Sequence, residues 1–275
     1  MYSKRLQHNS WPLVLVALLT IGGTAWTSPI AREWIYTTVR VQSSQELGTG
    51  FLVFRHTSQD SGDLFLVTNK HVVAPDTGSL SHARSLLLFI NAGGSDNMVT
   101  ETKYPIPLVD DLGQRLWRGH PDPRVDVLAV DITALIVQHP EIHHRDVPYS
   151  FFATHDTLRA QEITQGDEVL IIGYPDGRNP HVRSSFPIVR QGTIASVIGE
   201  QIKVPTDSGV VRIPGFEVDS AIIPGSSGSP VVLKPKTETA TPFLLGIISG
   251  TLRTQGLGIA YDAETIKETI ELFFR

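Results

Sequence analysis

The feature that most constrains the fold is a long succession of short apolar or alternating runs, each bounded by turn residues. Runs of this length and period predict β-strands instead of helices. The runs of the first half are Trp34–Val41, Gly50–Arg55, Leu64–Thr68, Ser85–Asn91 and Asp126–Ile132. Those of the second half are Glu168–Gly173, Arg190–Ile198, Val210–Val218, Pro230–Leu233, Phe243–Ser249 and Leu257–Tyr261. The pattern predicts a chain that is mostly β from about Glu33 onward.

A different pattern occupies the end of the chain, where apolar residues recur at helical spacing. The segment Asp262–Arg275 predicts a C-terminal α-helix capped by its first residue. Two sets of about six strands and this helix predict an all-β fold of two packed six-stranded antiparallel β-barrels. We place the first barrel at about residues 33–137, a linker rich in His, Asp and Pro at 138–165, and the second barrel with the helix at 166–275.

The first 28 residues have the composition of an export segment. Lys4 and Arg5 precede an apolar run, Trp11–Trp26, which is short for a membrane span of about 20 residues. Small residues near the end of this run suit a signal-peptidase site. Two interpretations stay open: a cleaved signal peptide, or a retained single-span membrane anchor. In both, the segment engages the export machinery, and residues 29–275 form the functional domain.

The composition limits the compartment and the partners. The sequence contains no cysteine, which excludes disulfides and thiolate metal sites. An exported protein of this size without disulfides is typical of a bacterial envelope, so we expect a periplasmic or secreted location, with anchoring by the N-terminal segment as the alternative. The formal net charge of −5 gives no indication of a nucleic-acid partner, and we expect none.

A histidine-rich stretch in the predicted linker has a spacing that metal ligands also show. It contains His139, His143 and His144, with Glu141 beside them. Zinc ligands need a rigid scaffold and a second shell of hydrogen bonds, and a proline-interrupted loop offers neither. We therefore expect a solvated loop here, and neither a metal nor a cofactor.

The strongest local motif surrounds Ser227, within the stretch Asp219–Val232. Gly225 and Gly228 flank this serine and allow a tight turn in which two backbone N–H groups face one point. The oxyanion of a tetrahedral intermediate requires such a pair of donors. Taken alone, a Gly-Ser-Ser-Gly stretch is also typical of a plain surface turn.

Two further motifs favour the catalytic interpretation. His71 follows an apolar strand, and Asp126 begins another. A serine hydroxyl needs a neighbouring imidazole to take its proton, and the imidazole needs a carboxylate to fix its tautomer. Asp122 and Asp131 are the competing carboxylates. The first sits between prolines outside the strand, and the second lies five positions beyond Asp126.

With these residues in the order His, Asp, Ser, the chain resembles the trypsin-like serine peptidases of the chymotrypsin fold. Among them it resembles the bacterial HtrA-type and glutamyl-endopeptidase-type enzymes. The matching stretches are Gly48–Leu52, Thr68–Val72, Gly166–Pro175, Asp219–Pro230 and Gly256–Ala260. The resemblance covers about residues 33–275. It implies a serine endopeptidase that hydrolyses protein or peptide substrates through an acyl-enzyme intermediate.

The resemblance also implies a role for each residue of the site. His71 would act as general acid and base, Asp126 as its orienting carboxylate, and Ser227 as the nucleophile. The backbone N–H groups of Gly225 and Ser227 would form the oxyanion hole. Ser249 corresponds to the family's serine that lies near the triad carboxylate.

In the family, the pocket for the residue before the scissile bond is lined from three places. The corresponding residues here are Ala221, Gly250, Thr251 and Gly258. None of them carries a charge, and Ile248 stands where some glutamate-specific relatives have a histidine. We therefore expect this pocket to take a small or medium apolar side chain.

The sequence departs from the family at the residue before the nucleophile. Ser226 stands where digestive enzymes have an aspartate that pairs with the freed N-terminus, so that activation switch has no acceptor here. The chain also ends before the PDZ domain of HtrA-type enzymes, so we expect no regulation through one. The alternative from another class is a catalytically silent binding module with the same fold. Retention of all three triad residues favours activity.

Overall fold

The structure is a computed structural model. It describes residues 6–7, 32–44, 46–58, 61–74, 80, 83–93, 99–177, 185–206, 209–237, 240–252 and 255–275. Apart from Leu6 and Gln7, the predicted signal peptide or anchor lies outside the described residues and stays a prediction. Within the described part of the chain, no helix combines the length and apolar character needed to cross a membrane.

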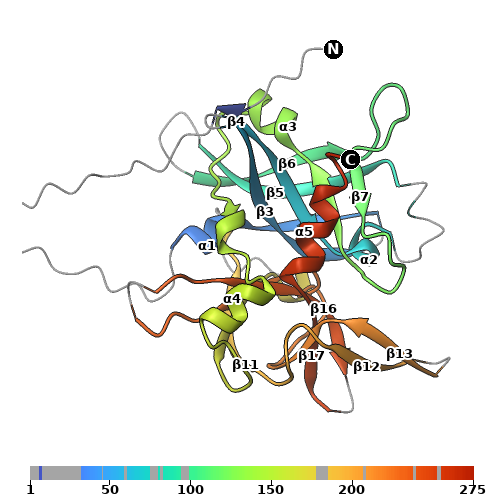
Figure 1. The fold of residues 1–275 in the computed structure, drawn as a ribbon. Coiled ribbons are helices and arrows are strands. Elements are labelled where there is room, and N and C mark those ends of the chain that lie inside the picture. The colour runs from blue at the N-terminus through green and yellow to red at the C-terminus, as the bar shows by residue number, and fades with distance from the viewer. Residues whose placement is uncertain are drawn as a thin grey trace, which may run out of the picture.

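The first set of strands forms a curled sheet (Figure 1). In spatial order its strands are β6 (Val99–Pro107), β5 (Ser85–Gly93), β2 (Thr38–Gln42), β3 (Leu47–Ser58), β4 (Ser61–Thr68), β8 (Leu128–Asp131) and β7 (Trp117–Gly119). The short strands β1 (Leu6–Gln7) and β9 (Val147–Pro148) pair with β4 and β3. The two ends of the sheet approach each other where Val109 bridges Arg115.

The second set closes into a six-stranded barrel. Around the barrel the strands are β10 (Glu168–Gly173), β11 (Ile188–Ile194), β14 (Phe216–Asp219), β17 (Leu257–Asp262), β16 (Leu244–Leu252) and β15 (Pro230–Leu233). The strands β12 (Gln201–Thr206) and β13 (Gly209–Pro214) form a separate ribbon. The single predicted strand Val210–Val218 is therefore divided at Gly215, where a Cβ atom would lie 2.3 Å from the Ala260 carbonyl oxygen.

Short helices connect the strands. They are α1 (Arg32–Thr37), α2 (Lys70–Val73), α3 (Thr133–Gln138) and α4 (His155–Ala160), with the 3₁₀ turns η2 (Tyr149–Phe151) and η3 (Pro175–Gly177). The predicted strand Trp34–Val41 is wrong in its first half, which is the helix α1. The hydroxyls of Thr37 and Thr38 both donate to the Trp34 carbonyl oxygen at 3.0 Å. Such local side-chain bonds favour a helical turn, and hydrophobic alternation does not reveal them.

The C-terminal helix α5 (Ala263–Glu271) lies across both strand sets, packed against β16 and β17 on one side and β7 and β8 on the other (Figure 1). Asp262 accepts from the Thr265 N–H at 3.0 Å and caps the helix as predicted. Arg55 on β3 donates to both carboxylate oxygens of Glu271 at 2.9 Å. These features confirm the all-β class with a terminal helix. The first strand set is a curled open sheet, and the second is a closed barrel.

Candidate active site

The turn after β4 places three consecutive residues against the loop between β7 and β8. Asn69 donates from Nδ2 to the Asp126 carbonyl oxygen at 2.6 Å. Lys70 donates from Nζ to the His120 carbonyl oxygen at 2.8 Å. The His71 backbone N–H donates to Asp126 Oδ1 at 3.1 Å. The first turn of α2 is therefore docked on the loop that carries the candidate carboxylate.

The carboxylate of Asp126 binds two side chains from different parts of the molecule. Its Oδ2 atom lies 2.5 Å from His71 Nδ1 and accepts from Ser249 Oγ at 2.8 Å. A carboxylate in this place holds the imidazole in the tautomer whose Nδ1 carries the proton. The Nε2 atom of His71 is then the basic atom of the ring.

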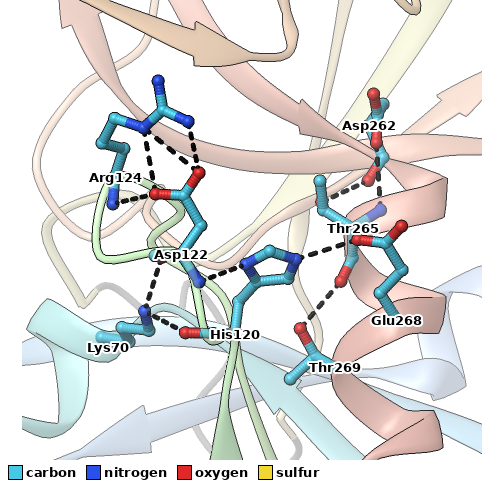
Figure 2. Close-up of polar contacts among 8 residues, drawn as sticks. All are labelled: Lys70, His120, Asp122, Arg124, Asp262, Thr265, Glu268 and Thr269. Atoms are coloured by element: carbon cyan, nitrogen blue, oxygen red, sulfur yellow. Dashed lines mark hydrogen bonds and ion pairs between the residues drawn. The ribbon is translucent and has the colours of Figure 1, made fainter.

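Figure 2 shows how the other end of the same loop is held. His120 Nδ1 accepts from the Asp122 N–H at 3.1 Å, so the proton of the neutral ring is on Nε2, which donates to Glu268 of α5 at 2.9 Å. Lys70 also donates to the Asp122 carbonyl oxygen at 3.4 Å, and Arg124 binds the Asp122 carboxylate with its shortest contact at 2.6 Å. The loop is thus bound by Lys70 of α2 on one side and by Glu268 of α5 on the other.

Burial and charge act in opposite directions on two of these groups. Burial of the His71 imidazole lowers its pKa, but the hydrogen bond and the charge of Asp126 together outweigh burial and raise the pKa above 6.5. Burial lowers the pKa of Lys70 below 10.5, although the carboxylates of Asp126 and Asp122 oppose this effect. The protonated forms of His71 and Lys70 are therefore both stabilised by the carboxylates of this loop.

The two competing carboxylates are engaged elsewhere. Hydrogen bonds from the side chain and backbone of Arg124 lower the pKa of Asp122 to about 2. Asp131, on β8, accepts from the Thr133 N–H at 2.9 Å at the start of α3. Of the three candidates, Asp126 is the one that lies beside the imidazole.

The turn before the candidate nucleophile fixes the direction of one peptide group. Ser226 N–H donates to the Ile223 carbonyl oxygen at 3.0 Å, and Gly225 has a φ of +86°. Proline followed by a glycine with positive φ is the pattern of a type II turn. The Pro224 carbonyl accepts from the Asp176 N–H at 2.6 Å. Because C=O and N–H of a trans peptide point in opposite directions, the Gly225 N–H faces away from Asp176.

The turn after the candidate nucleophile is packed against β3. Ser229 N–H donates to the Ser226 carbonyl oxygen at 3.0 Å, and Gly228 has a φ of +88°. A Cβ atom at Gly228 would lie 1.8 Å from the Thr49 carbonyl oxygen. The Thr49 N–H donates to the Ser227 carbonyl oxygen at 2.8 Å. Glycine is therefore required here both by conformation and by space.

Thr49 is a positioning contact that sequence reasoning missed. Its Oγ1 donates to the Gly225 carbonyl oxygen at 2.9 Å and accepts from the Tyr174 N–H at 3.0 Å. Its own carbonyl accepts from Thr68 Oγ1 at 2.8 Å. The stretch Gly48–Leu52 matches the family, but a hydrogen-bond partner in the other strand set leaves no local pattern in the sequence.

Ser249 contacts both parts of the site. Its Oγ binds Asp126, and its carbonyl oxygen accepts from Ser227 Oγ at 3.2 Å. Among the residues that the structure describes, no hydrogen bond joins Ser227 to His71, and the N–H groups of Gly225 and Ser227 donate to no protein acceptor. The predicted residues thus lie in one place, with two unpaired backbone donors in the nucleophile turn.

The predicted pocket residues lie on the strands and loop next to the nucleophile. A Cβ atom at Gly250 would meet nothing within 4 Å, so the space there is open. A Cβ atom at Gly258 would lie 2.6 Å from Ile222 Cγ1, so this isoleucine occupies the space over the glycine. Thr251 is the cross-strand partner of Gly258. The side chain of Ile222 was not part of the sequence prediction.

A charged group also lies at the predicted pocket, although sequence reasoning found none. Arg190, on β11, donates from Nη1 to the carbonyl oxygen of Ala221 at 2.7 Å. The two residues are 31 positions apart, on a strand and in a loop. Nothing in the local sequence around either residue indicates this contact.

The histidine-rich stretch makes contacts within itself and with β5 and β6. His139 Nδ1 lies 3.0 Å from Glu141 Oε1, and burial lowers the pKa of His144 to about 4. In the part of the chain covered by the structure, no group of three or more His, Cys, Asp or Glu side chains is arranged to hold a metal ion.

Comparison with known proteins identifies the family to which this chain belongs. The trypsin-like peptidase domain family matches residues 48–236, a segment that contains His71, Asp126 and Ser227. No curated protein matches the sequence. Because the family match spans more than half of the chain, it assigns the family directly.

Solved structures of proteases share the fold. Deg5 is 16% identical, with 87% of this chain and 89% of that chain covered and a TM-score of 0.53. The active form of the Rv3671c protease from M. tuberculosis is 18% identical, with 88% and 82% covered and a TM-score of 0.51. The inactive form of that protease is 18% identical, with 89% of this chain and 92% of that chain covered and a TM-score of 0.50. These likenesses show the same fold, and the family match gives the assignment: the chain belongs to the trypsin-like peptidase family and is a serine endopeptidase.

Proposed function

We propose that the chain cleaves peptide bonds with His71, Asp126 and Ser227 as a catalytic triad. The observation that carries this proposal is the position of the Asp126 carboxylate. It binds His71 Nδ1 at 2.5 Å and Ser249 Oγ at 2.8 Å, and the Ser249 carbonyl oxygen holds the Ser227 hydroxyl at 3.2 Å. Base, orienting carboxylate and nucleophile therefore belong to one hydrogen-bonded unit.

The reaction starts with a rotation of the Ser227 hydroxyl from the Ser249 carbonyl toward His71 Nε2, since catalytic hydrogen bonds often form only with substrate present. Ser227 Oγ attacks the scissile carbonyl carbon while His71 takes the hydroxyl proton, and a tetrahedral oxyanion forms. The N–H groups of Gly225 and Ser227 donate to this oxyanion. Asp126 stabilises the imidazolium that results.

The same groups complete the turnover. The imidazolium of His71 gives its proton to the leaving amine as the C–N bond breaks, and an acyl-enzyme on Ser227 remains. Water then attacks the acyl carbon while His71 takes its proton, and return of the proton to Ser227 releases the acid. Ala221, Gly250, Thr251 and Gly258 line the pocket for the residue before the scissile bond.

We also propose that the oxyanion donors need no charged N-terminus. The Pro224–Gly225 peptide is oriented by the Asp176 N–H at 2.6 Å, and the following Gly225–Ser226 peptide is held by Thr49 Oγ1 at 2.9 Å. Both are internal contacts. Ser226 has no carboxylate that an ammonium group would bind. A protein carrying extra residues ahead of Glu33 is therefore expected to be active.

Export of the protein is a separate part of the proposal. It is supported by Lys4 and Arg5 ahead of the apolar run Trp11–Trp26. N-terminal sequencing of the protein from the envelope fraction distinguishes the alternatives: a start near Trp26 or Ser28 indicates a cleaved signal peptide, and a start at Met1 indicates an anchor.

Labelling with a fluorophosphonate probe tests the triad. We expect the full chain to be labelled and the Ser227→Ala variant to be unlabelled, while Ser226→Ala, which removes the neighbouring hydroxyl, is labelled like the wild type. A folded wild type that resists the probe but binds peptides would favour the alternative, a silent binding module.

A further inference from the structure

Arg190 occupies an unusual electrostatic position. It is the register partner of Ile171 on the neighbouring strand β10, so its side chain leaves the sheet on the face of Ile171, which belongs to the apolar core. Its Nε atom is buried without a hydrogen-bond partner. Its Nη1 atom donates to the carbonyl oxygen of Ala221, an exposed residue, at 2.7 Å. The guanidinium therefore runs along the end of the barrel core to the loop that leads to Ser227.

Arg190 differs from four other arginines of the described segments in having no counter-ion. Ion pairs with Glu or Asp are formed by Arg40, Arg55, Arg124 and Arg159. No carboxylate of the described segments forms an ion pair with Arg190. A half-buried cation without a counter-ion is costly, because the protein replaces only part of its hydration. Its position is therefore one in which an external anion would be stabilised.

The anion would arrive with the substrate. Ala221 lies six residues before Ser227, and Gly250 leaves open space beside the nucleophile. Ile222 lies over Gly258 and gives this region an apolar wall. A substrate side chain that enters next to Ser227 would contact Ile222. It would also lie near the guanidinium of Arg190, which binds the preceding residue of the same loop, Ala221.

We infer that Arg190 is a specificity-determining residue that selects substrates with Asp or Glu immediately before the scissile bond. A guanidinium presents its donors in one plane and binds a carboxylate through two parallel hydrogen bonds. The inference rests on the proposed function. It replaces the apolar preference that the uncharged residues Ala221, Gly250 and Gly258 predict by themselves.

Peptides that differ only in the residue before the scissile bond, Glu, Gln, Ala or Lys, provide the test. The wild type is expected to cleave the Glu peptide with a kcat/KM about ten- to a hundred-fold above that for the Gln peptide. Arg190→Gln is expected to bring the two values close together, and Arg190→Glu to favour the Lys peptide. Arg159→Gln, at an exposed arginine, should keep the wild-type preference.

Equal cleavage of the Glu and Gln peptides by the wild type overturns the inference, whether or not the variants fold. Fluorophosphonate labelling separates this failure from that of the proposed function. A labelled wild type without acidic preference overturns the role of Arg190 alone. An unlabelled wild type overturns the proposed function and, with it, the inference.

Discussion

The two parts of the proposed active site are held in place by different means. The acid–base part depends on side chains, because Asn69, Lys70 and Asp126 make the contacts that dock α2 on its loop. The nucleophile part depends on backbone, because two turns with positive φ at Gly225 and Gly228 present the serine. A side-chain contact can be removed with little effect on the chain around it, whereas a glycine turn tolerates no added atom. Substitutions in the first part should therefore change catalysis far more than stability, and those in the second should also lower stability.

The largest effect is expected in the acid–base part. Asp126→Asn should lower kcat by about 10,000-fold, because the amide favours the wrong tautomer of His71. The melting temperature should change little. Asp122→Asn is the matched control, since that carboxylate is bound to Arg124, and activity should fall only a few-fold. Peptide hydrolysis and thermal unfolding of both variants decide the matter. If Asp122→Asn is the inactive variant, the carboxylate is wrongly assigned.

The nucleophile part should respond in the opposite way. In Gly228→Ala the new Cβ would lie 1.8 Å from the Thr49 carbonyl oxygen at a φ of +88°, so steric overlap and backbone strain add. We expect the free energy of unfolding to fall by about 2–5 kcal/mol, measured by denaturant titration. Gly113→Ala, with a φ of +74° and nothing within 4 Å, isolates the strain alone, about 1–2 kcal/mol. Equal losses in the two variants would show that packing against Thr49 contributes nothing.

A smaller effect is expected at Lys70. Lys70→Met removes the cation that holds the carbonyls of His120 and Asp122 but keeps an unbranched apolar stem. Hydrogen bonds from a charged group contribute about 1.5–3 kcal/mol. If only part of this free energy contributes to the placing of Asp126, kcat should fall about tenfold while KM stays unchanged. Lys70→Arg should restore most of the activity, and Lys203→Met, at an exposed lysine, should have no effect. A rise in KM without a change in kcat would contradict a positioning role.

The same contrast explains what could be predicted from the sequence. Strand periodicity is local, so the strand sets and the α5 cap at Asp262 were predictable. The motifs around His71 and Ser227 are also local, because a turn after a strand and a glycine-flanked serine each leave a short pattern. The contacts of Thr49, Lys70 and Arg190 are not local, since their partners lie 176, 50 and 31 positions away. They arise only when the sheet and the barrel have formed.

That the first strand set forms an open sheet and not a closed barrel could not be predicted, for a related reason. The five short apolar runs of the first half are compatible with a closed barrel or with a curled sheet, and the choice depends on whether the edge strands meet. Here the edges β6 and β7 are joined through the single bridge between Val109 and Arg115. The bonds that decide closure are few and lie between segments whose composition gives no distinct pattern.

The last prediction, and the smallest in size, concerns pH. The turn Ile223–Pro230 contains no titratable side chain, so the pH dependence near neutrality should come from the acid–base part. In the proposed mechanism, activity requires neutral His71, whose pKa is raised above 6.5. The acidic limb of kcat/KM should therefore lie above pH 6.5. In Asp126→Asn, burial acts without the opposing carboxylate, so the residual activity should titrate below pH 6.5.

Stability should follow the opposite course, because a raised pKa means that folding favours the protonated ring. The contribution of His71 to the free energy of unfolding should be fully present below pH 6.5 and should disappear as the pH rises through the folded-state pKa. In that window activity increases while this stabilisation decreases. Denaturant titrations of the wild type and His71→Gln at several pH values measure the difference. If the difference is constant across the window, the Asp126 contact does not raise the pKa of His71, and the acid–base part is not coupled as its short hydrogen bond implies.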